Sequence, residues 1–192
     1  MIQIWLKCLH MNHPSGNTNV RVFFALWPAD AERDQLVAWQ KPLHHLCGGR
    51  TMRGETLHTT LVFIGDIEQS RLEALQLAAK EASGKAFELC FDVAHYWGHN
   101  HIVYAAPGEV PKQLVQLAVT LEQRLAGHHF SFERREYKPH VTLLRNAKWT
   151  DALLPGMPPV RWQIKDFVLV QSMLQDGMTR YQVLAKFPLR VG

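Results

Sequence analysis

Residues 57–65 read L-H-T-T-L-V-F-I-G, and residues 137–145 read Y-K-P-H-V-T-L-L-R. Both stretches contain a histidine, one intervening residue, a threonine and a leucine, and their histidines stand 82 residues apart (140 − 58). The β-branched and apolar residues around them predict a strand in each stretch. A predicted helix precedes each strand, so the surroundings are repeated as well as the motif. We therefore expect two related halves that each contribute one of these strands.

The rest of the chain predicts a mixture of helices and antiparallel strands. R-V-F-F-A-L-W (21–27) predicts a buried strand. Leucines recur with helical spacing over 68–83 and 111–126, and a glycine follows each stretch. The strand-like segments 87–97 and 101–106 flank a G-H-N tripeptide and predict a hairpin. The sequence thus predicts the α+β class rather than a doubly wound parallel sheet.

The two histidine motifs carry the chemistry that we expect of this chain. Side chains alternate between the faces of a strand, so His58 and Thr60 share one face. The same holds for His140 and Thr142. If the halves are related by approximate two-fold symmetry, two imidazoles and two hydroxyls surround one small anion. In-line hydrolysis of a phosphodiester needs a base for water and an acid for the departing oxygen, and histidine performs either role near neutral pH. Threonine hydroxyls can donate hydrogen bonds to the non-bridging oxygens.

The composition is that of a globular protein with a modest positive charge. The 192 residues are 47% hydrophobic and 20% charged, with a formal net charge of +4 and a pI of about 9.1. These values exclude a disordered or fibrous chain and favour an anionic partner such as RNA. Three cysteines outside any metal motif predict a reducing, cytoplasmic location, and no apolar run has the ~18 residues of a membrane helix. We interpret residues 1–18 as a loose N-terminal extension.

Three motifs together resemble one known family. They are R-V-F-F-A-L-W-P (21–28) and the two histidine motifs at 57–65 and 137–145. The chain resembles the 2H phosphoesterases, most closely the bacterial RNA 2′,3′-cyclic phosphodiesterases once called 2′-5′ RNA ligases, from about Arg21 to Phe187. The resemblance implies one bilobal α+β domain over 19–192, with antiparallel sheets flanking a central cleft and helices outside. We expect a monomer that needs no metal and no other cofactor.

The same resemblance implies the reaction and the residues that perform it. The reaction opens a terminal 2′,3′-cyclic phosphate on RNA, or on a nucleotide, to a 2′-phosphate. His58 is the expected proton donor to the leaving 3′ oxygen, and His140 is the expected proton acceptor that activates water. Thr60 and Thr142 are expected to bind the phosphate.

The residues expected to contact the base are aromatic or cationic. Phe63 and Arg145 stand five residues after the two histidines, and the family resemblance implies that they sandwich the terminal base. Strict alternation places both on the face opposite the histidines, so they reach the cleft only if each strand bends or ends there. We assign Trp27 and Trp39 to the core. Trp97, near the predicted hairpin, is the tryptophan that we single out for stacking on RNA.

Other functions stay open at this point. The same chemistry serves reversible 2′-5′ joining or cleavage of RNA, or hydrolysis of a small nucleotide cyclic phosphate. A nucleotide- or RNA-binding module without turnover would keep the fold, although the intact motifs argue against it. A metallohydrolase would use His95, His99 and His101, whose spacing suits zinc, but no cysteine or paired carboxylate joins them.

Overall fold

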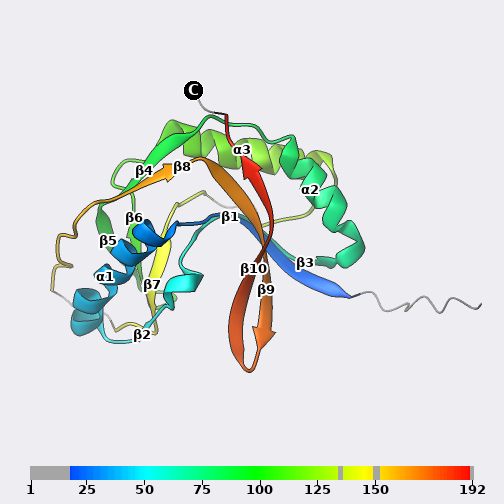
Figure 1. Ribbon diagram of the computed structural model, residues 1–192. Helices are drawn as coiled ribbons and strands as arrows, with labels where there is room; N and C mark the ends of the chain where they lie inside the picture. Colours follow the sequence, from blue (N-terminus) through cyan, green and yellow to red (C-terminus); the bar gives the residue numbers. More distant parts are fainter. Residues whose placement is uncertain (1–17, 134–135, 149–151, 191–192) are drawn as a thin grey trace, which may run out of the picture.

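The computed structural model describes residues 18–133, 136–148 and 152–190, so the expected N-terminal extension lies outside the described residues except for Thr18. The architecture is α+β, as predicted, with three α-helices and two sheets in the described part of the chain (Figure 1). One sheet has eight strands in the order β10-β9-β1-β3-β7-β6-β5, with β2 paired to β7. The second sheet joins β4 to β8, and the strand pairs of both sheets are antiparallel.

The elements have the following bounds. The strands are β1 (Asn19–Leu26), β2 (Arg50–Thr51), β3 (Thr59–Glu68), β4 (Phe87–Phe91), β5 (Val93–Trp97), β6 (Ile102–Ala106), β7 (Val141–Arg145), β8 (Val160–Ile164), β9 (Asp166–Gln175) and β10 (Met178–Pro188). The α-helices are α1 (Asp30–Cys47), α2 (Leu72–Lys80) and α3 (Lys112–Gly127), and short 3-10 helices cover Gly54–Thr56 (η1) and Gln69–Arg71 (η2).

The large sheet consists of two halves that meet at one residue pair. β10, β9, β1 and β3 form one half, and β7, β6, β5 and β2 form the other. Among the described residues, Thr59 and Val141 are the only Cα partners between β3 and β7. The two halves are therefore joined at the centres of the two histidine motifs.

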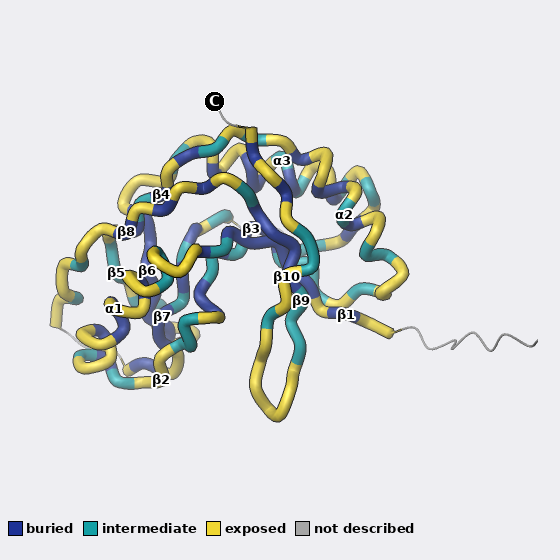
Figure 2. The backbone as a smooth tube through the Cα atoms, in the orientation of Figure 1, coloured by how far each residue is buried: buried dark blue, intermediate teal, exposed yellow. Residues whose placement is uncertain are grey.

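The helices cover the two halves separately. α1 packs against β7 and β8, whereas α2 packs against α3, and α3 contacts β3 (Figure 1). Each helix buries one apolar face, and Trp39 of α1 lies in the core as predicted, with 1% of its surface exposed. Complete burial of a large apolar side chain contributes about 1.5–3 kcal/mol, so these faces fix the helices on the sheet. Figure 2 shows the contrast with the tip of the β9–β10 hairpin, which is exposed.

One segment differs from its prediction in a way that matters for the site. Residues 87–97 form two strands in different sheets rather than one. Asp92 separates the two strands, and its Oδ1 accepts a hydrogen bond of 2.6 Å from the amide of Gly108. β5 belongs to the large sheet, where it forms the predicted hairpin with β6 and carries Trp97 to the neighbourhood of His140. Within the residues that the structure describes, no helix has the length and apolar character that crossing a membrane requires.

Candidate active site

The two histidine motifs meet at the junction between the halves of the sheet. Thr59 and Val141, the middle residues of the motifs, are Cα partners and are fully buried. The strands begin later than predicted, so His58 and His140 are the residues immediately before β3 and β7. In an antiparallel pair the neighbours on either side also approach one another, on the face opposite the central pair. Four side chains consequently line one pocket of about 240 Å³: His58, Thr60, His140 and Thr142.

A matched irregularity in each strand brings two further residues into this pocket. Phe24 and Ala25 of β1 are neighbours, but their partners on β3 are Val62 and Thr60, so Leu61 is an extra residue. A β-bulge of this kind shifts the alternation of side chains by one position. Phe63 therefore lies on the same face as Thr60 and lines the pocket, contrary to strict alternation.

The second motif contains the same bulge at the equivalent position. Val103 and Tyr104 of β6 pair with Leu144 and Thr142, so Leu143 is the extra residue. Arg145 accordingly lines the pocket beside Thr142, and its side chain is exposed to solvent. Strict alternation would place Phe63 and Arg145 on the opposite face, and the bulge one residue after each threonine is the irregularity that lets both line the pocket.

Each of the two histidine rings is held by a hydrogen bond of the same kind. Nδ1 of His58 lies 2.7 Å from the carbonyl oxygen of Thr56, and Nδ1 of His140 lies 2.7 Å from that of Lys138. A carbonyl oxygen only accepts, so each Nδ1 carries a hydrogen and donates it. Nε2 is then the ring nitrogen that gains and loses a proton. The pocket thus contains two imidazole rings that are held in place by the backbone and share the tautomer with hydrogen on Nδ1.

The surroundings of the two rings differ. His58 stacks on Trp27, with ring centroids 5.4 Å apart and an interplanar angle of 8°, and it also contacts Phe23 and Tyr181. Burial lowers the pKa of His58 to about 4; the carbonyl of Thr56 opposes this effect, and the charges of His140 and Arg145 add to it. His58 is thus neutral at neutral pH in the ligand-free protein.

His140 meets aromatic rings by their edges instead. Trp97 lies with its ring centroid 4.6 Å from that of His140 at 69°, and Tyr104 lies at 5.6 Å and 73°. Trp97 also lines a second pocket of about 450 Å³, which shares Thr60, Phe63, His140, Thr142 and Arg145 with the first. The connected pockets offer room for a nucleotide beyond the phosphate.

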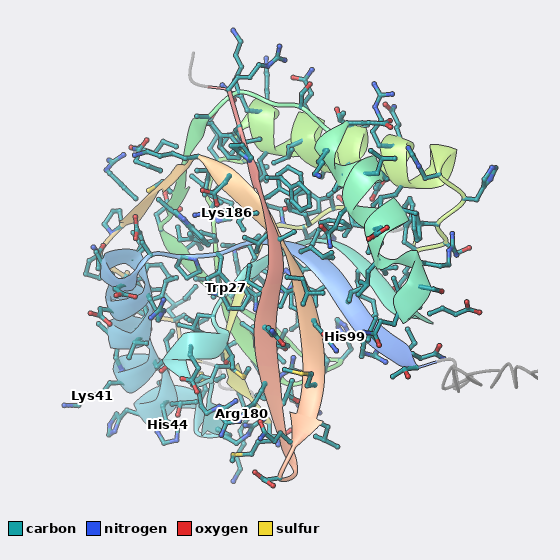
Figure 3. The ribbon with its side chains drawn as sticks, turned by 45° about the vertical axis from the view of Figure 1, so that its right-hand side comes forward. Trp27, Lys41, His44, His99, Arg180 and Lys186 are labelled. Atoms are coloured by element: carbon teal, nitrogen blue, oxygen red, sulfur yellow. The ribbon has the colours of Figure 1, made fainter. Side chains whose placement is uncertain are left out.

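Several site residues were not recognised from the sequence. Phe23, Met52, Thr56 and Tyr181 line the smaller pocket. Tyr181 reaches it from β10, far along the chain, and no local pattern distinguishes it from other strand residues. Trp27, which we assigned to the core, is partly exposed and stacks on His58 beside the β9–β10 hairpin (Figure 3).

Of the histidines of the β5–β6 hairpin, His99 lines the larger of the two pockets. Nδ1 of His101 lies 2.9 Å from the hydroxyl of Tyr96, His95 contacts the ring of Tyr104, and His99 contacts Trp97. Across residues 18–133, 136–148 and 152–190, no three or more His, Cys, Asp or Glu side chains are grouped so as to hold a metal ion.

Comparison with known proteins gives the family of the chain. Residues 28–175 match the model of the 2′-5′ RNA ligase superfamily, and the chain belongs to this family. It is 31% identical over 172 residues to an RNA 2′,3′-cyclic phosphodiesterase of Escherichia coli, covering 88% of this chain and 96% of the relative. A protein of the same name from Thermus thermophilus is 28% identical, with 89% and 91% covered.

A solved structure agrees with this assignment. The crystal structure of Escherichia coli LigT complexed with 3′-AMP superimposes with a TM-score of 0.82 at 29% identity, over 90% of this chain and 99% of that one. The predicted family resemblance and the predicted α+β fold are both confirmed.

Proposed function

We propose that this protein hydrolyses the terminal 2′,3′-cyclic phosphate of RNA to a 2′-phosphate, by two-histidine acid–base catalysis without a metal ion. The observation that carries the proposal is that two His-x-Thr motifs meet in a single pocket of about 240 Å³, although their histidines stand 82 residues apart in the sequence (140 − 58). The names of its relatives, RNA 2′,3′-cyclic phosphodiesterases from several organisms, support the same activity.

The proposed reaction assigns one proton transfer to each histidine. Nε2 of His140 takes a proton from water as the water oxygen bonds to phosphorus. The bond between phosphorus and the 3′ oxygen breaks, and protonated Nε2 of His58 donates its hydrogen to that oxygen. Since each Nδ1 is tied to a backbone carbonyl, both rings are oriented before the substrate arrives.

The two threonines and the negative charge of the substrate have further roles in the proposed mechanism. The hydroxyls of Thr60 and Thr142 line the pocket beside the histidines and can donate to the non-bridging oxygens as charge develops. The lowered pKa of His58 means that the ligand-free enzyme holds this ring neutral. A bound phosphodiester anion favours the protonated form, so His58 becomes a proton donor only with substrate in place.

Phe63 and Arg145 are proposed to hold the terminal base. The two bulges bring them to the same pocket, one from each half of the sheet. An aromatic ring and a guanidinium on opposite sides of a base provide stacking and cation–π contacts that every base can accept. The predicted cytoplasmic location and monomeric state stay predictions.

The proposal is tested with an oligonucleotide that ends in a 2′,3′-cyclic phosphate, incubated with a strong chelator. We expect a product that carries a 2′-phosphate and a free 3′-hydroxyl, and loss of activity by about 10²- to 10⁴-fold in His58→Ala and His140→Ala. A 3′-phosphate product, or activity abolished by the chelator in a wild-type preparation, contradicts the proposal. An acceptor with a 5′-hydroxyl in the same reaction reveals any 2′-5′ joining, and binding without turnover identifies a non-catalytic module.

A further inference from the structure

Trp27 occupies a special position relative to His58. The last partners of β1 and β3 are Leu26 and Thr59, so the next residues outward, Trp27 and His58, are cross-strand neighbours. Their rings are nearly parallel, at 8°, with centroids 5.4 Å apart. This is an offset stack of an indole on an imidazole, a geometry in which the π face of one ring lies against the other.

The sequence around Trp27 explains the geometry. Side chains of β1 alternate, so Phe23, Ala25 and Trp27 share the site face, while Phe24 and Leu26 are fully buried on the other. Pro28 restricts Trp27 to an extended backbone. Phe23 contacts His58 at 4.9 Å and 33°. The small side chain of Ala25 between the two aromatic residues leaves space for an imidazole.

His58 thus contacts three aromatic rings, one of which is stacked on it face to face. Tyr181 of β10 closes a third side with its edge, at 5.2 Å and 86°. His140 contacts Trp97 and Tyr104 edge-on, at 69° and 73°. The described tryptophan beside His58 is therefore stacked on its ring, and the described tryptophan beside His140 meets its ring edge-on.

A tryptophan face attracts a cation that lies against it, more strongly when water is excluded. The charged and titratable groups that act on His58 are His140, just before β7, and Arg145 at the end of β7, and the phenol of Tyr181 on β10 also contacts it. A positive charge on His140 or Arg145 disfavours a proton on His58. The electron-rich face of Trp27 instead favours the protonated form of His58.

We propose that Trp27 is a positioning residue, which holds the His58 ring and stabilises its protonated form at the moment of proton donation. This inference rests on the proposed function for its catalytic consequence. Its physical part, the coupling of Trp27 to the charge of His58, depends only on the stacked geometry of the two rings. Trp27 lies behind the imidazole and outside the lining of the His58 pocket, so it contacts no reacting atom.

The first test is independent of activity. Imidazole ¹H–¹⁵N correlation spectra of the full chain, with the His58 signal assigned by its loss in His58→Asn, give the tautomer and pKa of His58 with and without inorganic phosphate. Trp27→Leu keeps the position apolar but removes the π face. We expect it to lower the pKa of His58 by roughly 1, while Trp27→Phe stays close to wild type.

The second test is kinetic, on the cyclic-phosphate oligonucleotide. Trp27→Leu is expected to lower kcat about tenfold with KM nearly unchanged, and Trp27→Phe to restore most of it. Trp162→Phe, which alters a buried tryptophan of β8, is the matched control and keeps wild-type values. Far-ultraviolet circular dichroism confirms that each variant is folded.

The outcomes separate this inference from the proposed function. An unchanged pKa of His58 in a folded Trp27→Leu variant overturns the role of Trp27, whatever the enzyme hydrolyses. A shifted pKa in a protein that fails to open the cyclic phosphate keeps the coupling and rejects the proposed reaction. If Trp27→Leu changes KM rather than kcat, Trp27 acts on substrate binding and the positioning role is wrong.

Discussion

Thr59 and Val141 are paired across the centre of the large sheet, and their side chains point away from the pocket that their neighbours line. This pair joins the two halves of the fold and at the same time sets the spacing of the catalytic candidates. The flanking histidines and threonines emerge on the opposite face, from two strands that separate beyond the junction. The fold therefore creates the site at the point where its two halves meet.

The first prediction compares Thr59 with its neighbour Thr60. Oγ1 of Thr59 is buried without a hydrogen-bond partner among the described residues, whereas Thr60 lines the pocket. Thr59→Val removes an uncompensated buried hydroxyl, so the free energy of unfolding should rise by about 1–2 kcal/mol with kcat retained. Thr60→Val should leave stability nearly unchanged and lower kcat about 100-fold. Urea denaturation gives the free energy of unfolding of both variants, and steady-state kinetics give their kcat. A more stable Thr60→Val together with a low kcat in Thr59→Val contradicts the assignment of the two side chains to opposite faces.

Much of the site was predictable from the repeated motif, because a histidine and a threonine two residues apart share a strand face wherever the strand lies. The positions of Phe63 and Arg145 were not, since a bulge depends on the register with the neighbouring strand. In hindsight the adjacent buried residues after each threonine, Leu61–Val62 and Leu143–Leu144, are the local trace of the bulges. The same limit applies to Tyr181, which tertiary packing alone brings to His58.

The second prediction concerns the pH dependence of stability. The pKa of His58 falls from 6.5 to about 4 on folding, so between these pH values the unfolded chain binds more protons than the folded protein. Stability is then complete above pH 6.5 and is lost progressively as the pH falls to 4, by roughly 3 kcal/mol at most. Unfolding free energies measured at both ends of this window should differ less in His58→Asn than in wild type. His45→Asn, at an exposed position of α1, serves as the control and should keep the wild-type difference.

The third prediction tests the proposed contact of Arg145 with the base. Arg145→Ala should raise KM for a cyclic-phosphate oligonucleotide about tenfold with a smaller effect on kcat, because the lost cation–π contact is present in ground state and transition state alike. The penalty should vanish for a cyclic phosphodiester that has no base. Arg161→Ala, which removes a cation of β8 paired to Glu88, should behave as wild type. An equal penalty with and without a base would show that Arg145 acts on the phosphate instead.

The last prediction assigns the two proton transfers. A nitrophenolate leaving group needs no proton, so an aryl phosphodiester bypasses the general acid but still requires activated water. If His58 is the donor, His58→Ala should lose about 10²- to 10⁴-fold on the cyclic phosphate and retain near wild-type activity on the aryl ester. His140→Ala should be impaired on both substrates. The neutral state of His58 in the free protein makes this comparison necessary, since that state would also suit a base. If His140→Ala instead keeps its activity on the aryl ester while His58→Ala is impaired on both substrates, His140 is the proton donor and His58 the acceptor. The two histidines would then still form the catalytic pair.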